Sequence, residues 1–363
     1  MTSTPSRHEN VRAPRPPLLA RAGRMIPRRG ALAAGALAAL ALPGCGLTEP
    51  VDTSAVQTPD DDPDARVVRF GHPYDPSHVV ETTGVQILRE ELAPHGIVLR
   101  SYPSAQLGGE AETAEQVATG GLEFAVVGPS FLGVWNSPAA VLDAAYLFTS
   151  VEQFDQATTG EVMGRINDET AEKTGLRALA TWFYGNRHIT SNRPIIQPSD
   201  LDGLRIRTPD APMYLTNFGI MGGSPTPMAL SEAYLGLQQG TIDAQENPIP
   251  TIEVQRFYEV QDYLNLSAHC VQGINIVTSE HFLDTLEPEQ RDAVHDAVET
   301  ARVAIRDAVV AEEEDILATW REEDAITIND EVDIDAFQAL VAEEMPDRVA
   351  WGDLYLEIQE SVQ

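Results

Sequence analysis

Short strand-like segments alternate with helical segments through most of this sequence, and this alternation limits the possible folds more than any other feature. Residues 67–72, 97–103 and 124–128 are predicted strands, the third almost continuously apolar, as buried parallel strands are. Residues 79–92 and 111–119 are predicted helices, and a proline or a glycine pair follows each of them. Short strands separated by such helices are typical of an α/β sheet with parallel character. The sequence therefore predicts the α/β fold class.

The middle and the C-terminal part of the chain continue this pattern. Further strands are predicted at residues 175–185, 187–192, 204–209 and 273–279. Residues 288–323 contain no glycine and few helix-breaking residues, so they are predicted to form one very long helix or two abutting helices. With 363 residues, 43% of them hydrophobic, the chain can form one large domain or two medium ones. Two α/β lobes with a cleft between them suit this length.

The charge of the chain is strongly acidic and unevenly distributed. The net charge is −32 at pH 7, yet residues 1–44 contain seven arginines and only one acid, Glu9. The remaining residues hold 17 basic and 55 acidic side chains. Phosphate backbones would repel such a surface, which argues against binding of nucleic acid. An acidic surface suits a cell exterior or a salt-rich habitat, and both explanations stay open.

The N-terminal residues 1–45 have the pattern of an export signal. Arg28 and Arg29 precede the apolar run 31–42, which is too short to cross a bilayer and leads into Cys45. The arginine pair suggests the twin-arginine export route, and Cys45 occupies the position at which bacterial lipoproteins carry their lipid. We therefore expect a secretion and lipoprotein signal with lipidation at Cys45. The alternative is an uncleaved anchor helix.

Residues 46–65 are rich in proline, aspartate and threonine and have almost no large apolar residue. This composition predicts a flexible tether between a lipid anchor and a domain that begins at residue 66. We therefore expect an extracytoplasmic protein, either periplasmic or attached by its lipid to the outer face of the cell membrane. The two cysteines, Cys45 and Cys270, make no disulfide framework, and Cys270 is predicted to be a small buried hydrophobic residue.

Motifs of common enzyme classes are absent from the sequence. There is no phosphate-binding loop, no dinucleotide-binding glycine motif, no HExxH motif and no GxSxG motif. His72 and His78 are six positions apart across two prolines, which is not the spacing of a helical metal pair. The sequence therefore predicts no catalytic residue, no metal site and no cofactor.

Two arginines lie on short strand-like stretches that run toward turns, where open α/β sheets bind their ligands. Arg187 lies in GNRHITSN and Arg207 in GLRIRTPDAPMY. A guanidinium holds a carboxylate with two parallel hydrogen bonds, so both residues are candidates for binding a small anion. The alternative for each is a salt bridge with one of the many acids, and we assign Arg205 to that alternative.

Two further polar residues are candidates for contacts to a ligand. Asn247 lies in QENPIP, and the proline after it favours an extended backbone that presents the amide. An amide donates to a carboxylate and accepts from a hydroxyl; the alternative is an ordinary turn. Glu110 follows two glycines at a predicted helix start, where the helix dipole stabilises a carboxylate. Pointed into a cleft, Glu110 would instead accept hydrogen bonds from a ligand hydroxyl or amine.

Four segments, in this order, resemble one protein family: SAQLGGE, GNRHITSNRPI, DLDGLRIRTPDAPMY and GGSPTPMALSEAYLGLQQGTIDAQENP. The chain is similar to the substrate-binding subunits of tripartite ATP-independent periplasmic (TRAP) transporters, the DctP family. The resemblance covers roughly residues 66–340, and the last segment is the most specific. It implies a two-lobed fold like that of type II periplasmic binding proteins, with a ligand cleft between the lobes and a long helix that spans both.

The resemblance also implies lobe boundaries and ligand contacts. The first lobe would comprise residues 66–184 and 273–312, and the second lobe residues 185–272 and 313–363. One arginine of the set would clamp the carboxylate of the ligand, and the turn 129–131 would help to line the first lobe. The implied ligand-binding residues are Arg207 as the clamp, Arg187, Asn247, Glu110, Asp210 and His72.

The predicted function is the capture of an organic carboxylate outside the cytoplasm and its delivery to the small and large membrane subunits of a TRAP-type secondary transporter. Sugar acids and uronates suit the polar candidates Glu110, Asp210 and His72, whereas dicarboxylates suit the two arginines. A ligand-sensing protein for a membrane receptor would use the same binding chemistry. An exported hydrolase is the other alternative, although the resemblance implies a protein that is not an enzyme.

Overall fold

The computed structural model describes residues 65–362. The predicted export signal, Cys45 and the predicted tether up to residue 64 lie outside the described residues. Within the described part of the chain, no helix combines the length and the apolar composition that a bilayer crossing requires.

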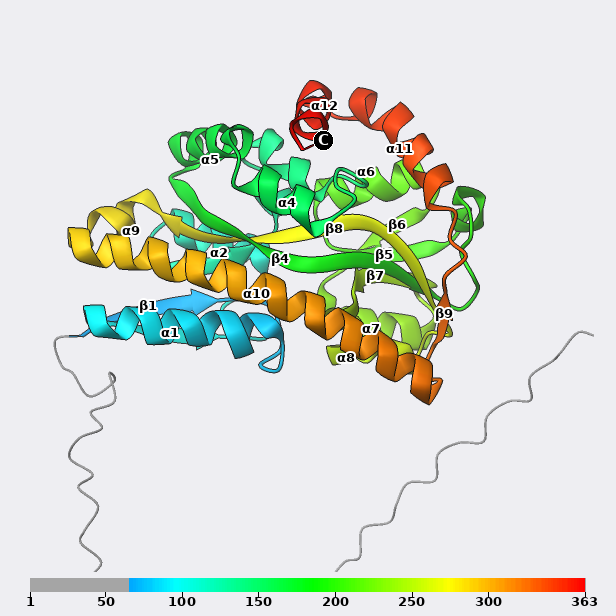
Figure 1. Ribbon diagram of the computed structural model, residues 1–363, viewed down its shortest axis with the longest axis horizontal. Helices are drawn as coiled ribbons and strands as arrows, with labels where there is room; N and C mark the ends of the chain where they lie inside the picture. Colours follow the sequence, from blue (N-terminus) through cyan, green and yellow to red (C-terminus); the bar gives the residue numbers. More distant parts are fainter. Residues whose placement is uncertain (1–64, 363) are drawn as a thin grey trace, which may run out of the picture. The chain divides into compact units, whose positions relative to one another are not determined.

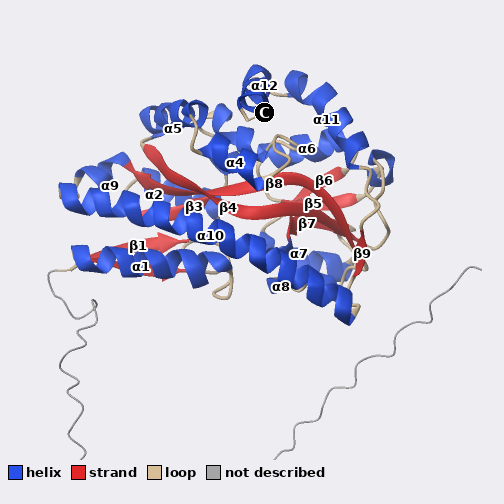
Figure 2. Cartoon of the chain, in the orientation of Figure 1, coloured by secondary structure: helices blue, strands red, loops and turns tan. Residues whose placement is uncertain are grey.

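One mixed β-sheet forms the centre of the described chain (Figures 1 and 2). Across the sheet the strand order is β2, β1, β3, β8, β4, β7, β5 and β6, and β9 pairs with β8 outside this path. The strands are β1 (Arg66–Gly71), β2 (Ile97–Tyr102), β3 (Phe124–Val127), β4 (Leu176–Ser191), β5 (Arg205–Thr208), β6 (Ser224–Pro227), β7 (Ala244–Pro248), β8 (Tyr263–Ser279) and β9 (Thr327–Asn329).

Helices cover both faces of this sheet, which confirms the α/β class (Figure 1). The helices are α1 (Gln86–Leu92), α2 (Glu110–Ala118), α3 (Pro129–Leu132), α4 (Val151–Thr158), α5 (Glu161–Thr174), α6 (Pro212–Met221), α7 (Leu230–Gln239), α8 (Ile249–Val254), α9 (Glu280–Asp284), α10 (Pro288–Glu323), α11 (Ile334–Arg348) and α12 (Gly352–Ser361). Short helical turns are η3 (Val80–Val85), η4 (Ala93–His95), η5 (Ser137–Asp143), η6 (Pro198–Leu201) and η7 (Phe257–Glu259).

The sheet consists of two parallel groups joined by an antiparallel centre. Strands β1, β2 and β3 pair in parallel at one end, and β5, β6 and β7 pair in parallel at the other. The long strands β4 and β8 lie antiparallel to each other between these groups. The centre differs from the predicted parallel sheet because β4 leads the chain from the first group to the second, and β8 leads it back.

The two long central strands are longer than the sequence pattern predicts. Two separate strands were predicted in residues 175–192, but β4 runs through Gly185 without ending. The first ten residues of β8 were not predicted as strand at all. They include polar side chains such as Ser267, His269 and Gln272, which interrupt an apolar pattern although all three are buried. Because these buried residues are polar, the apolar pattern did not predict the first half of β8.

Residues 288–323 form a single helix, α10, which confirms one of the two predicted alternatives. Near its start the Trp182 indole N–H of β4 donates to the Val298 carbonyl oxygen at 3.0 Å. Near its end the Trp320 indole N–H donates to Glu253 of α8 at 2.8 Å. The helix therefore spans from the first strand group to the second (Figure 1).

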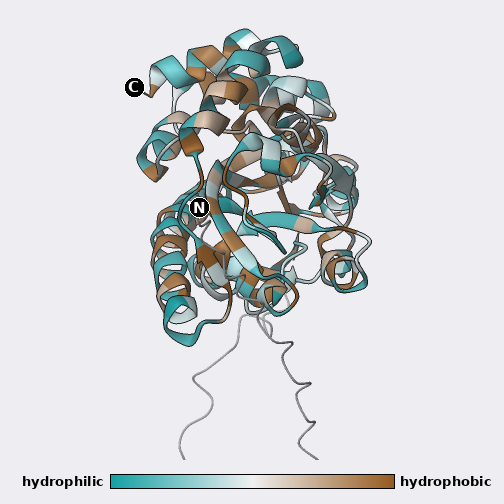
Figure 3. Ribbon diagram, turned by 90° about the vertical axis from the view of Figure 1, so that its right-hand side faces the viewer, coloured by the Kyte–Doolittle hydropathy of each residue, from teal (hydrophilic) through white to brown (hydrophobic). Residues whose placement is uncertain are grey.

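The helices turn hydrophobic residues inward and hydrophilic residues outward (Figure 3). Most buried apolar residues form one cluster that includes β1, β3, β4, α6 and the first turns of α10. A smaller cluster lies around α7, α8 and the last turns of α10, with Phe257 and Trp320 as its largest members.

The C-terminal helix α12 differs from the predicted lobe assignment. Residues 313–363 were assigned to the second lobe, but the Tyr355 hydroxyl donates to the Ala145 carbonyl oxygen at 3.3 Å. Glu357 pairs with Arg165 of α5 at 2.8 Å. Helix α12 thus packs against segments assigned to the first lobe, because side chains far apart in sequence decide where a terminal helix docks. The other lobe boundaries stay predictions.

Candidate functional site

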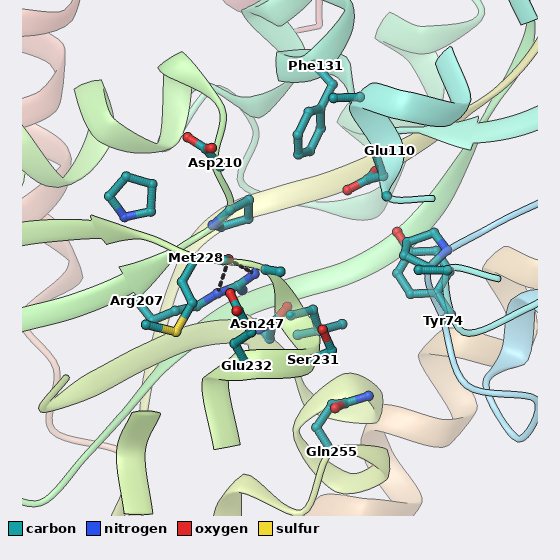
Figure 4. Close-up of a pocket in the computed structure, with 18 of the residues that line it drawn as sticks. Tyr74, Glu110, Phe131, Arg207, Asp210, Met228, Ser231, Glu232, Asn247 and Gln255 are labelled. Carbon is teal, nitrogen blue, oxygen red and sulfur yellow. Dashed lines mark hydrogen bonds between the residues drawn. The ribbon is translucent and has the colours of Figure 1, made fainter. Parts of the chain in front are cut away.

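A cavity of about 560 Å³ lies between segments from the two ends of the sheet. Tyr74 after β1 and Glu110 of α2 face it from one side, across from Arg207 and Met228 (Figure 4). Five of the six predicted ligand-binding residues line this cavity: Arg207, Arg187, Asn247, Glu110 and Asp210. The fold therefore brings together residues that are up to 137 positions apart in the chain.

Arg207 is a buried cation that faces the cavity. Its Nε and Nη2 both donate to the Met228 carbonyl oxygen, at 2.9 and 2.7 Å. Among the described residues, no carboxylate forms an ion pair with it and no group accepts from its Nη1. Burial lowers the pKa of Arg207 to about 10, although the charge of Glu246 acts in the opposite direction. The guanidinium is therefore charged at neutral pH and is stabilised by any anion that enters.

The position of Arg207 follows from the alternation of side chains in β5. Ile206 points into the hydrophobic core, and Arg207 points the other way toward the cavity. Arg205, two residues earlier, reaches the surface, where its Nε and Nη2 donate to Asp243 at 2.8 and 2.7 Å. The prediction that Arg205 forms a surface salt bridge is confirmed.

Arg187 lies in the same cavity but is held by an acidic partner. Its Nε and Nη2 both donate to the carboxylate of Glu246, and its Nη1 donates to the Gln272 side chain. The guanidinium also lies over the Tyr214 ring, 5.2 Å from the centroid. Burial lowers the pKa of Arg187, but the charge of Glu246, the hydrogen bond to Glu246 and the nearby Tyr214 and Tyr184 together hold the pKa above its ordinary value. The ion pair is therefore neutral as a unit, and only part of this cation is available to a ligand.

Asn247 is the last residue before Pro248, where β7 ends and α8 begins. Its Oδ1 accepts from Arg187 Nη2 at 3.2 Å, and its Nδ2 donates to Gln245 Oε1 at 2.6 Å. The amide is thus oriented on both sides by described residues. The predicted extended backbone before the proline agrees with this strand.

Two carboxyl groups lie on the side of the first strand group. Glu110 accepts from the backbone N–H of Gly128 at 2.8 Å through Oε1, and no described residue donates to its Oε2. Burial raises the pKa of Glu110 to about 7, against the lowering effect of that N–H. Asp143 lies behind the cavity, where burial likewise raises its pKa to about 7 and the Ser130 N–H opposes this. These carboxyls therefore change charge near neutral pH.

Further acids line the cavity. Asp210 and Glu232 line it with exposed side chains (Figure 4). Phe131, from the predicted turn 129–131, contributes an apolar ring on the side of Glu110 (Figure 4). These acids repel a second negative charge on a bound anion, whereas its hydroxyl groups can donate to them.

His72 is the one predicted residue that the fold does not bring into the cavity. Its Nε2 lies 3.0 Å from Glu81 and 3.2 Å from the Ser101 hydroxyl, and its side chain is fully buried. The chain leaves β1 at Gly71 and turns, so that the following Pro73 and Tyr74 reach the cavity instead. His72 stacks behind Tyr74, with ring centroids 6.0 Å apart.

Several residues that line the cavity were not identified from the sequence: Tyr74, Tyr184, Tyr214, Gln255 and Gln272. Tyr74 and Tyr184 pack with ring centroids 5.0 Å apart. Tyr184 directly precedes the GNR segment and Tyr214 ends the segment that contains Arg207, so proximity to the candidate arginines was a usable signal. Gln272 lies in the unpredicted half of β8, where no signal pointed to it.

A family comparison agrees with this architecture. The model of the bacterial extracellular solute-binding proteins, family 7 (DctP), matches residues 81–360. The chain belongs to this family. The predicted resemblance is thereby confirmed, and with it the two-lobed fold of the TRAP solute-binding proteins.

Relatives of known structure or name support the family 7 assignment. The sialic acid-binding periplasmic protein of Vibrio cholerae is 33% identical over 64% of this chain and 73% of that protein. A TRAP periplasmic solute-binding protein from Roseobacter denitrificans, solved with bound L-galactonate, is 30% identical with a TM-score of 0.76, over 83% of this chain and 99% of that one. One from Ochrobacterium anthropi, solved with bound L-fuconate, is 27% identical with a TM-score of 0.77, over 82% and 100%.

This family 7 protein is therefore a solute-binding protein of the TRAP type, as predicted. TRAP solute-binding proteins bind small organic acids outside the cytoplasm and work with TRAP membrane subunits. Which residues of this chain contact the solute is a separate question, for which the cavity supplies the candidates.

Proposed function

We propose that this protein binds a hydroxylated monocarboxylate, a sugar acid or uronate, in the 560 Å³ cavity and delivers it unchanged to TRAP membrane subunits. The observation that supports this is the buried Arg207, which forms no ion pair with a described residue. Such a cation is costly to bury and is compensated when a carboxylate binds. Arg207 would hold the ligand carboxylate, with Arg187 and Asn247 as further contacts.

The charges around the cavity favour one carboxylate over two. Glu246 already neutralises Arg187, so Arg207 is the cation without an acidic partner among the described lining residues. Glu110 lies across the cavity from Arg207, and the exposed Asp210 also lines the cavity. A second ligand carboxylate would meet these acids, whereas hydroxyl groups would donate hydrogen bonds to them. L-Galactonate and L-fuconate, bound in the two similar structures, have this chemistry.

The interaction energies suffice for such a ligand. Hydrogen bonds to charged groups contribute about 1.5–3 kcal/mol each, and micromolar affinity requires about 8 kcal/mol in all. Two bonds from Arg207 with one each from Arg187 and Asn247 would supply much of this. Binding and release need no nucleophile and no base, so the ligand leaves as it entered.

A thermal-shift screen tests the ligand class, because a ligand that binds the folded state raises Tm by mass action. We expect L-galactonate, L-fuconate or D-galacturonate to raise Tm and succinate and malate to leave it unchanged. Ligand recovered after days of incubation should be chemically intact by mass spectrometry. A Tm increase with the dicarboxylates alone, or conversion of the sugar acid, would contradict the proposal.

We also propose that Cys45 carries a lipid that holds the protein at the outer face of the membrane. This proposal comes from the sequence of residues 1–45 alone. Mass spectrometry of the N-terminal peptide should show a diacylglyceryl adduct at Cys45, and Cys45→Ser should release the protein into the soluble fraction. An unmodified peptide that begins elsewhere would contradict it.

A further inference from the structure

Tyr184 and Arg187 of β4 both line the cavity although they are three positions apart. In a regular strand successive side chains alternate between faces, so an odd spacing places two residues on opposite faces. The strand must therefore be irregular between them. Whatever holds this irregularity also decides whether Arg187 reaches the cavity.

The irregularity is a β-bulge at Tyr184. Phe183 pairs with Gly273 of β8 and Gly185 pairs with Gln272, so Tyr184 is an extra residue on β4. Bulges of this kind redirect the side chains that follow. Gly185 has a φ of 129°, and a Cβ there would lie 2.6 Å from Pro248 Cβ. Only glycine fits this backbone path.

A carboxylate from α10 closes the bulge. Glu313 Oε1 accepts from the backbone N–H of Asn186 at 2.8 Å, and Oε2 accepts from Asn186 Nδ2 at 3.1 Å. The side chain of Glu313 thus takes the place of a strand partner for the residue just before Arg187. Glu313 is buried, with 8% exposure, and its Oε1 would lie 2.7 Å from a Cβ at Gly185.

Among the described residues, Glu313 has no cationic partner. Burial raises the pKa of Glu313 to about 7 although the two Asn186 bonds lower it, and Glu312 raises it further. Among the described residues no basic side chain pairs with it. Burial of an acid without a cationic partner costs free energy. The hydrogen bonds that compensate Glu313 come from Asn186 of β4.

We propose that Glu313 is a positioning residue for ligand binding: just after the bulge at Tyr184, it holds Gly185 and Asn186 of β4 in the path that turns Arg187 into the cavity. The carboxylate pins the Asn186 backbone to the helix that spans both strand groups, and Arg187 then meets Glu246 and the cavity in one orientation. The inference depends on the proposed function in one respect: Arg187 is taken as a contact to the ligand.

Nuclear magnetic resonance of the ligand-free protein tests this without knowledge of the ligand. The reporter is the Nε–H signal of Arg187, which donates to Glu246 and is identified by its loss in Arg187→Lys. Hydrogen exchange of the Asn186 amide is the second reporter. The variants are Glu313→Ala, which removes both acceptors, and Glu313→Gln, which keeps an acceptor. Glu314→Ala is the control, because Glu314 is the exposed neighbour on α10.

In Glu313→Ala we expect the Arg187 signal to shift or broaden and the Asn186 amide to exchange at least tenfold faster, at a temperature well below Tm. Glu313→Gln should restore both reporters, and Glu314→Ala should leave them as in the wild type. If Glu313→Ala does not fold, Glu313→Asp shortens the side chain by one methylene and should give the same changes.

If Glu313→Ala lowers Tm but leaves both reporters unchanged, Glu313 has a purely structural role and the inference is overturned. These reporters need no ligand, so they respond to Glu313 even if every sugar acid fails to bind. Conversely, sugar acid binding that persists while the reporters stay unchanged would retain the proposed function and reject the role of Glu313.

Discussion

Arg187 and Arg207 line the same cavity, and their surroundings differ in one decisive respect. Around Arg187, β7 supplies the carboxylate of Glu246, so the pKa of this arginine lies above its ordinary value. Around Arg207, the one hydrogen-bond acceptor among the described residues is the neutral carbonyl oxygen of Met228, and burial lowers the pKa to about 10. A buried cation is ready for an anionic ligand when the protein holds it by part of its hydrogen bonds but leaves its charge uncompensated.

The largest expected effect is a loss of stability when Arg187 loses its acidic partner Glu246. Glu246→Gln preserves the shape of the side chain but leaves Arg187 as an unpaired buried charge, so the free energy of unfolding should fall by about 3–5 kcal/mol. Urea denaturation measures this. The control is Glu123→Gln, which breaks a similar pair with the partly exposed Arg69 and should cost about 1 kcal/mol or less. Equal losses in the two variants would contradict the comparison.

The second effect is a loss of affinity for the ligand when Arg207, the cation without an acidic partner among the described residues, is removed. Arg207→Ala should weaken binding of a sugar acid found in the thermal-shift screen by at least about a hundredfold, about 2.7 kcal/mol, because its charge-assisted bonds are lost. Isothermal titration calorimetry measures this. The stability of the ligand-free protein should change little or rise, since an unpaired buried charge is removed. Unchanged affinity would refute the clamp.

A smaller effect is expected from the acid across the cavity. The pKa of Glu110 is raised to about 7, with Asp143, Arg187 and Arg207 as the nearest charges. A bound anion raises this pKa further, so the complex holds more protons than the free protein and affinity falls as pH rises. We expect about a three- to tenfold loss between pH 6 and pH 8. Glu110→Gln should abolish this dependence; a slope that persists in the variant would assign it to another group.

The smallest expected effect is a change in ligand affinity on substitution of Arg205, which does not line the cavity. Arg205→Ala removes a surface pair with Asp243 two residues from Arg207. Its affinity for the same sugar acid should stay within about twofold of the wild type, since exposed ion pairs are screened by solvent. A loss comparable with that of Arg207→Ala would mean that the charge of the region, and not the position of one guanidinium, attracts the ligand.

The alternation of short apolar segments predicted most strands and the helix α10, because these elements depend on periodicity along the chain. The first half of β8 was missed because its buried residues are polar and satisfied by partners elsewhere. The bulge at Tyr184 was mistaken for a strand end, since the glycine that follows it within the strand resembles a break. Helix α12 was assigned to the second lobe but packs against segments assigned to the first, for a similar reason: its partners are distant in sequence.

The sequence by itself determined the α/β class, the family and the set of candidate side chains, because these follow from local pattern and residue order. Only the tertiary structure decided that Arg187 is paired with Glu246, that Arg207 is not paired with an acid among the described residues, and that His72 faces away from the cavity. The charge available to a ligand at Arg187 depends on an acidic partner 59 residues away along the chain. Electrostatic compensation acts through space, so a list of residues does not contain it until the chain has folded.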